Sequence, residues 1–323
     1  MKQKYSHISL ARLCGWFGIT RQAYYQNNWQ GTTTSIEEEL VLQQVIKIRQ
    51  THRRMGTRKL YEKLEGFMLE HVIKMGRDGL FNLLASNGLL IRKRKRSVST
   101  TNSHHWLRKY PNLIKDFIPT GINQVWVSDI TYWKISTGEH LYISFITDAY
   151  SHKIVGYHVA QTLETVESIK ALQMALSAFD GAESHLKLTH HSDRGIQYCS
   201  HAYVKLLQEN DIQISMTENG DPRENAIAER INGIIKGEYL ETYQVYSVKQ
   251  ASELLDAVVE LYNSDRPHMS IGNLTPNHVH QPKSNIITEK LWKTNYRNNA
   301  TFVNLNQDYD SNVKSQQDYS TNL

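Results

Sequence analysis

The sequence of 323 residues predicts an α/β protein, in which an all-α first part precedes a mixed β-sheet with helices on its faces. One observation is a change of hydrophobic period: apolar residues recur at helical spacing up to residue 118, and short runs rich in Val, Ile, Tyr, Trp and Thr begin at Asn123. The other is a change of charge. Residues 1–118 contain 21 Lys and Arg against 8 Asp and Glu, whereas the remaining residues contain 16 against 24. A basic part joined to an acidic part is typical of a polyanion-binding module attached to a centre that needs carboxylates, although chance asymmetry between two solvated surfaces would look the same.

Composition excludes three classes of protein. Hydrophobic residues make up 40% of the chain, which is too many for a wholly disordered protein. No apolar run approaches the ~18 residues that span a bilayer, and the first residues lack the apolar stretch of a signal peptide. Cys14 and Cys199 are too few for a disulfide scaffold or a zinc finger. We therefore expect a protein of a reducing cytoplasm without a membrane partner.

The segment 1–34 is predicted to form two short helices. Helical spacing over Ser9–Phe17 ends at Gly18, and Thr20 is placed to cap a helix over Arg21–Asn27. Helix, glycine turn and helix is the outline of a helix-turn-helix, for which the alternative is an ordinary helical hairpin with its polar side in water.

The segment 35–97 is predicted to be a second helical domain. Ser35 and Glu38 form a capping-box pattern that would start a helix, and two further helices are expected over 57–64 and 76–86. The domain ends in a basic sequence, which has too much like charge to pack on itself.

Five consecutive cations precede a basic linker that we place at residues 98–118. A contact with the DNA backbone is the interpretation we favour for this run, because the whole first part has the same sign of charge. The alternative is a solvated linker. The five cations are Arg92, Lys93, Arg94, Lys95 and Arg96.

The remaining sequence has the element order β-β-β-α-β-α-β-α-α, which predicts a sheet domain over residues 119–283 and a polar tail over 284–323. The expected strands cover 124–133, 141–149, 154–162, 186–190 and 212–216, and the expected helices cover 165–179, 202–210, 226–240 and 248–262.

Three carboxylates fall at positions suited to chemistry. Asp129 shares a strand face with apolar neighbours, where an ionised side chain is costly to bury unless it is paired or bound to a cation. Asp193 follows the strand 186–190, at a sheet edge where loops open for ligands. Glu229 lies on a predicted helix, and Asp148 is a rival that closes a strand or forms a turn.

The predicted helix that carries Glu229 has a polar face formed by Asn225, Glu229, Asn232 and Lys236. A solvated helix face is the alternative to a functional one. Together with the two aspartates, Glu229 completes a set of hard oxygen ligands of the kind that Mg²⁺ prefers. Two such ions, roughly 3.5–4 Å apart, activate the attacking oxygen and stabilise the leaving oxygen in an in-line displacement at phosphorus.

The spacing of these residues, and the motifs around them, resemble those of the retroviral-integrase-like transposases. Thirty-five residues separate Asp193 from Glu229. The resemblance covers residues 45–280 and is to the second-reading-frame (OrfB-type) product of a bacterial insertion-sequence family. The motifs that carry it are Trp126 with Asp129-Ile130-Thr131-Tyr132, His191-Ser192-Asp193-Arg194-Gly195, Asn225-Ala226, Lys236, Tyr262-Asn263, Arg266-Pro267-His268 and Thr275-Pro276.

The resemblance implies a ribonuclease-H-like catalytic core at 119–283, preceded by a helix-turn-helix-like DNA-binding domain at 35–97. It implies that Asp129, Asp193 and Glu229 are the catalytic residues and hold two Mg²⁺ ions, for which Mn²⁺ can substitute. The expected reaction is end cleavage and strand transfer of an insertion sequence, that is, DNA integration, recombination and transposition.

The resemblance also implies partners and a location. We expect double-stranded DNA at element ends and target sites, a homo-oligomer on that DNA, a first-reading-frame partner protein, and a bacterial cytoplasm with association to the nucleoid. His191 either orients Asp193 or contacts a phosphate, or it is a packed core residue, and Arg266 and His268 either reach DNA or cap the last helix. The expected DNA contacts are Lys236, Asn225, Asn232, Arg194, Arg266 and the five cations from Arg92 to Arg96.

Two other functions stay open at this point. A catalytically silent DNA-binding regulator or domesticated remnant would bind DNA without depending on a divalent metal. A nuclease of the same fold would hydrolyse DNA without joining it.

Overall fold

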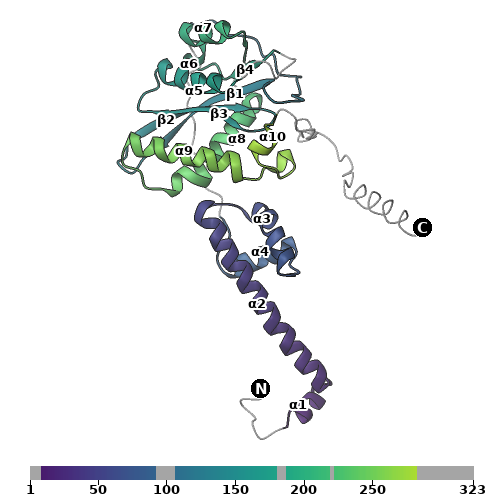
Figure 1. Ribbon diagram of the computed structural model, residues 1–323. Coiled ribbons are helices and arrows are strands. Elements are labelled where there is room, and N and C mark those ends of the chain that lie inside the picture. Colours follow the sequence, from purple (N-terminus) through teal and green to yellow (C-terminus); the bar gives the residue numbers. More distant parts are fainter. Residues whose placement is uncertain (1–8, 92–105, 180–186, 219–221, 282–323) are drawn as a thin grey trace, which may run out of the picture. The chain divides into compact units, whose positions relative to one another are not determined.

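A computed structural model describes residues 9–91, 106–179, 187–218 and 222–281, and its larger part is built on a five-stranded sheet (Figure 1). The strand order is β3-β2-β1-β4-β5. The first three strands pair antiparallel, whereas β4 pairs parallel with β1 and β5 pairs parallel with β4. The expected mixed sheet of ribonuclease-H-like topology is therefore confirmed. The strands are β1 (Val125–Lys134), β2 (His140–Asp148), β3 (Ile154–Ala160), β4 (Thr189–Ser192) and β5 (Gln213–Met216).

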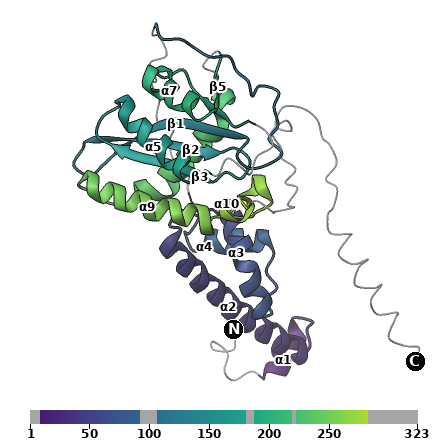
Figure 2. The ribbon, with the colours of Figure 1, turned by 45° about the horizontal axis from the view of Figure 1, so that its top comes forward.

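Helices cover both faces of this sheet, with α5 and α7 on one side and α8 and α9 on the other (Figure 1), and Figure 2 shows α7 and α9 on opposite sides of the strands. Alternation along β1 explains the two layers, since Trp126 packs in the cluster with α5 and α7 and Trp133 packs in the cluster with α8 and α9. The helices are α5 (Thr165–Ser177), α6 (Ile196–Cys199), α7 (His201–Glu209), α8 (Ala226–Ile234), α9 (Val248–Asp265) and α10 (Pro276–Val279).

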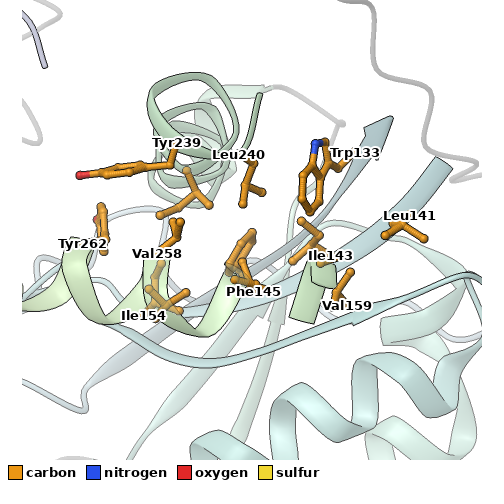
Figure 3. Packing of buried hydrophobic residues seen from close by; sticks show 14 of the residues in the cluster. Trp133, Leu141, Ile143, Phe145, Ile154, Val159, Tyr239, Leu240, Val258 and Tyr262 are labelled. Carbon is orange, nitrogen blue, oxygen red and sulfur yellow. The ribbon is translucent and has the colours of Figure 1, made fainter. Parts of the chain in front are cut away.

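The core between the sheet and α9 is closely packed (Figure 3). Phe145 and Ile143 of β2 and Ile154 of β3 belong to the same buried cluster as Val258 and Tyr262 of α9. This apolar layer fixes the face of the sheet on which α8 and α9 lie.

The helix expected over 226–240 is three segments in the structure. After α8 the chain forms a π-helical turn over Ile235–Tyr239 and a 3₁₀ turn over Leu240–Thr242. The wider π turn keeps Ile235 and Tyr239 in the apolar cluster.

The first part is helical, as predicted, with α1 (Leu10–Trp16), α2 (Arg21–Thr51), α3 (Thr57–Glu70) and α4 (Arg77–Ser86). Ser9 and Thr20 cap α1 and α2 through their side-chain oxygens. Gly18 between them has a φ of +65°, which is why a glycine serves this turn. The order of helix, glycine turn and helix is confirmed, whereas the short second helix expected over Arg21–Asn27 is wrong, and a helix-turn-helix role stays a prediction.

The helix start expected at Ser35 is wrong, because α2 runs unbroken from Arg21 to Thr51. The boundary expected between residues 34 and 35 therefore falls inside one helix. The physical reason is that ending a helix and starting another costs a new nucleus, whereas extending a helix adds one hydrogen bond per residue.

The strand expected over 186–190 begins later, at Thr189, and ends at Ser192, so Asp193 follows it directly. The described part of the linker, 106–118, forms no helix or strand. Two hydrogen bonds tie it to β5, from Met216 N–H to the Pro111 carbonyl and from Leu113 N–H to Ser215 Oγ. The cations at 92–96 and the tail at 284–323 lie outside the described residues. No described helix combines the length and the apolar character that crossing a bilayer requires.

A glycine on β3 gives a test of this packing. A Cβ atom on Gly156 would collide with the Ala171 carbonyl oxygen of α5 and lie 2.9 Å from the Cβ of Ala175. We expect Gly156→Ala to lower the free energy of unfolding by about 1–3 kcal/mol, because the backbone of α5 has to move. Urea unfolding measures the loss.

Gly233→Ala is the matched control. Gly233 lies on α8, where an added Cβ would meet nothing within 4 Å beyond its own stretch of helix, so the alanine is expected to be neutral or to stabilise the chain by up to about 1 kcal/mol. Equal stability of Gly156→Ala and the unchanged chain would contradict the close approach of β3 and α5.

Candidate active site

Parallel pairing of β1 with β4 places two aspartates side by side. Ser128 and Ser192 are the last paired residues of this ladder, and Asp129 and Asp193 each come next. Matching positions on neighbouring strands lie about 4.8 Å apart, so the two carboxylates extend from adjacent points of the backbone. Asp129 opposes Phe145 across the β1–β2 ladder, in the layer that α8 and α9 cover.

Two buried amides attach α8 to β1, one just before the helix and one near its end. Asn232 Nδ2 donates to Asp129 Oδ2 at 2.8 Å, and Asn225 Nδ2 donates to the Ser128 carbonyl oxygen at 2.9 Å. Glu229 lies one turn before Asn232 on the same helix. The contacts of the two asparagines therefore bring the helix of Glu229 to the strand of Asp129.

The three carboxylates influence one another. The pKa of Asp129 is raised to about 7, first by burial and then by the negative charge of Asp193, and Glu229 adds a smaller contribution. Hydrogen bonds from Ile130 N–H and Asn232 act in the opposite direction without offsetting it. Asp129, Asp193 and Glu229 are thus one electrostatic cluster, which the approach of a cation would relieve.

The side chains of the three carboxylates do not converge on one point. Over the described ranges, no three His, Cys, Asp or Glu side chains stand close enough to hold a metal ion as placed. Glu229 is exposed, so its side chain can change rotamer at little cost. The Oδ1 atoms of Asn225 and Asn232 are buried and have no hydrogen-bond partner within the described residues. Unused oxygen acceptors therefore lie beside the carboxylates.

A short turn orients Asp193. Its Oδ1 accepts a hydrogen bond from Gly195 N–H at 2.9 Å, and a Cβ on Gly195 would lie only 2.9 Å from the same oxygen. Glycine at this position lets the backbone approach the carboxylate. Arg194 between them is half-buried and stays a predicted DNA contact.

His191 is a packed histidine, one of its two expected roles. Burial lowers its pKa to about 4, so the ring is neutral near pH 7. Its Nδ1 lies 2.8 Å from Ser215 Oγ, and its Nε2 lies 3.1 Å from the Glu224 carbonyl oxygen. His191 therefore ties β4 to β5 and to the residues that lead into α8.

The neighbouring His190 supports the site from the other face of the sheet. Its Nε2 lies 2.7 Å from Ser128 Oγ and 3.0 Å from Tyr203 Oη. Burial lowers its pKa to about 3, so this ring too is neutral. The contacts join β1, β4 and α7 directly behind Asp129.

Asp148 is not a rival for the active site. Its Oδ1 accepts hydrogen bonds from Ser151 N–H and Ser151 Oγ at 2.7 Å each, and its Oδ2 accepts one from Asn123 N–H at 2.8 Å. Both oxygens are used in a buried turn, which is the alternative that the sequence left open.

Three expected DNA contacts need correction. Arg266 is fully buried and forms a two-point ion pair with Glu238, through Nε to Oε2 at 2.9 Å and Nη2 to Oε1 at 2.8 Å. It therefore stabilises the fold rather than reaching DNA. Asn225 and Asn232 are each only 6% exposed and use their amide N–H groups on β1, so they position α8.

Lys236 packs against an aromatic ring and stays a predicted DNA contact. It is half-buried, and its Nζ lies 3.9 Å from the centre of the Tyr132 ring. Burial lowers the pKa of its ammonium, and Tyr132 raises it in part. The cations from Arg92 to Arg96 lie outside the described residues and remain predicted contacts.

Sequence reasoning missed the links among the predicted residues. The bond from Asn232 to Asp129 could have been found, because the Asn lies three residues after Glu229 on a face already assigned to the site. The contact of Tyr132 with Lys236 could not, because it joins a strand to a helix about 100 residues later and depends on the π turn that contains Lys236.

The sequence matches two family models, both described as an integrase core domain, over residues 119–222 and 210–276. It is 34% identical over 270 residues to the insertion element IS600 uncharacterized 31 kDa protein of Shigella sonnei, which covers 82% of this chain and 96% of the relative. It is 31% identical over 228 residues to the transposase for insertion sequence element IS629 of Shigella sonnei, which covers 70% of this chain and 74% of the relative.

Solved structures with similarity include the HTLV-2 integrase catalytic core domain in complex with magnesium. It has a TM-score of 0.40 and 18% identity, and the match covers 50% of this chain and 98% of that one. A putative transposase for IS986/IS6110 of Mycobacterium tuberculosis is 30% identical over 225 residues, or 68% of this chain and 79% of the relative. From these relatives and the integrase core models, the chain belongs to the insertion-sequence transposases that carry an integrase core domain.

Proposed function

We propose that this chain is a DNA transposase that cuts the ends of an insertion sequence and transfers them into target DNA, with Asp129, Asp193 and Glu229 as its catalytic carboxylates. The observation that carries the proposal is the parallel register of β1 and β4, which sets the two aspartates next to each other on the face that α8 covers. The proposed substrate is double-stranded DNA, at the element end and at the target. Assembly as a homo-oligomer on that DNA, and a first-reading-frame partner protein, stay predictions.

The donor set supports divalent metal binding at this site. It consists of carboxylate and amide oxygens, and Mg²⁺ prefers such hard ligands with water and phosphate completing its shell. After burial, the negative charges of Asp193 and Glu229 both raise the pKa of Asp129, which supports the nearness of the three carboxylates. We propose Asp129, Asp193 and Glu229 as the ligands of two Mg²⁺ ions, with Mn²⁺ as a substitute.

Bound Mg²⁺ would supply activation of the attacking oxygen and neutralisation of charge on the phosphate. The residues of the chain orient the carboxylates. Asn232 fixes one oxygen of Asp129, and Gly195 N–H fixes one oxygen of Asp193, so each carboxylate presents its remaining lone pairs in a set direction. Both cleavage and strand transfer are phosphoryl transfers that need no covalent protein intermediate.

Replacing the acid on α8 tests the assignment. We expect Glu229→Gln to lower both nicking and joining of labelled element-end DNA in Mg²⁺ by about 100-fold or more, because the amide keeps the shape of the side chain and loses its charge. Denaturing gels resolve both products. Glu253→Gln on the exposed surface of α9 is the matched control and should leave both rates unchanged.

Three other outcomes separate the alternatives. Equal activity of Glu229→Gln and the unchanged chain rejects the role of Glu229. Nicked DNA without joined products indicates a nuclease, and DNA binding without cleavage or metal dependence indicates a regulator.

The repulsion between the carboxylates predicts a pH-dependent stability of the metal-free chain. Asp129 has a pKa of about 7 in the folded chain, against an ordinary value of 3.8. Its contribution to the free energy of unfolding is therefore complete below pH 3.8 and is lost as the pH rises through 7. We expect Asp193→Asn to raise the free energy of unfolding in EDTA by roughly 1 kcal/mol at pH 8 and by less at pH 5, because one source of repulsion is removed.

Thermal unfolding at the two pH values measures this difference, with Glu253→Gln again as control. Added Mg²⁺ should stabilise the unchanged chain at pH 8 more than Asp193→Asn. A variant that is less stable than the unchanged chain at pH 8 would show that the negative charge of Asp193 does not strain the metal-free site.

A further inference from the structure

The aromatic contact of Lys236 joins the two elements that carry the catalytic carboxylates. Tyr132 lies on β1 three residues after Asp129, and Lys236 follows Glu229 by seven residues in the π turn after α8. Their separation, 3.9 Å from Nζ to the ring centre, is well within the ~6 Å range of a cation–π interaction. The position of this cation therefore depends on the same strand and helix as the proposed active site.

The sheet leaves room for this contact. β4 pairs only with Val125–Ser128 of β1, so the stretch of β1 from Asp129 to Lys134 continues beyond the end of its parallel neighbour. Tyr132 stands on this continuing stretch and is half-buried. His140 on β2 packs against its ring edge-to-face at 5.9 Å between centroids, which fixes the plane of the ring.

The chemistry of the partner matters for what Lys236 can bind. Among the described residues no carboxylate forms an ion pair with Lys236, and its charge interacts with Tyr132 instead. An aromatic face attracts an ammonium without neutralising it, whereas a carboxylate would cancel the charge. The Tyr132 ring thus fixes the ammonium and leaves its positive charge available to an anion.

We propose that Tyr132 is a positioning residue for DNA, whose ring holds the Lys236 ammonium at the stretch of β1 that extends past β4, to meet a phosphate of the bound DNA end. The inference rests on the proposed function. It adds Tyr132, a residue that is neither charged nor a proposed metal ligand. The bound group is a phosphodiester of duplex DNA.

The test compares Tyr132→Phe with Tyr132→Leu in the full chain. Phe keeps the ring face, and Leu removes it while filling part of its space. We expect Leu to weaken binding of a labelled duplex with the terminal repeat by about three- to tenfold, and Phe to stay within about twofold. Fluorescence anisotropy measures the affinity, and Tyr246→Leu, which removes a largely exposed ring elsewhere, should have no effect.

A double-variant cycle distinguishes positioning from a general structural role. In a Lys236→Gln background, Tyr132→Leu should cause no further loss of affinity, because the ring has no cation left to hold. An equal loss in both backgrounds, or a loss with Phe as large as with Leu, would overturn the inference.

The contact itself is measured without DNA. After reductive ¹³C-methylation of lysines, the Lys236 resonance, assigned by its absence in Lys236→Arg, should be shifted upfield by the ring in the unchanged chain and in Tyr132→Phe but not in Tyr132→Leu. A chain that shows this shift and binds no element-end DNA overturns the proposed function. A chain that binds such DNA through Lys236 but is indifferent to Tyr132 overturns this inference alone.

Discussion

Parallel pairing of β1 with β4 forces two carboxylates to matching positions on neighbouring strands, and the surrounding fold has to hold them there. Asp129 and Asp193 are set next to each other by backbone hydrogen bonds, which do not respond to the repulsion between the carboxylates. A chain that holds such a pair needs stabilisation from elsewhere. The two apolar layers of the sheet provide it, since they fix β1 from both sides.

The buried side chains that tie the strands together around the aspartates are neutral. Two histidines, held uncharged by burial, and two asparagines link β1, β4, β5 and α8 through hydrogen bonds. Neutral donors can be buried at lower cost than charged ones, and they orient carboxylates without cancelling their charge. The surroundings therefore keep the negative charge of the site intact for a ligand that is positive.

The order of strands and helices could be predicted from the sequence because period, turn residues and caps are local signals. Two predictions failed. The capping pattern at Ser35 does not start a helix, because α2 extends through it, and the α-helix expected to continue after Ile234 changes to a π-helix. The adjacency of Asp129 and Asp193 is a non-local fact of register. The resemblance of motifs anticipated it, whereas the spacing of the residues alone did not.

The wrong prediction that Arg266 contacts DNA also arose because its partner is distant in the sequence. Its place after a helix was equally compatible with a surface role, and only its ion pair with Glu238, 28 residues away in the chain, decides that it is interior. Lys236 and Arg266 are both cations in family motifs, and the partner that each finds in the fold, an aromatic ring or a carboxylate, determines whether its charge remains available to solvent.

The π turn over Ile235–Tyr239 changes the phase of the chain after α8. An uninterrupted α-helix that buries Ile231, Ile234 and Ile235 would next bury position 238, which is a glutamate. The wide turn delays the buried position by one residue, so that Tyr239 enters the apolar layer and Glu238 is displaced sideways to Arg266. Deleting Lys236 or Gly237 would restore the regular winding, carry Tyr239 to that buried position, and turn Glu238 away from Arg266. The one extra residue wound into the segment between α8 and α9 therefore allows Glu238 to neutralise the buried Arg266.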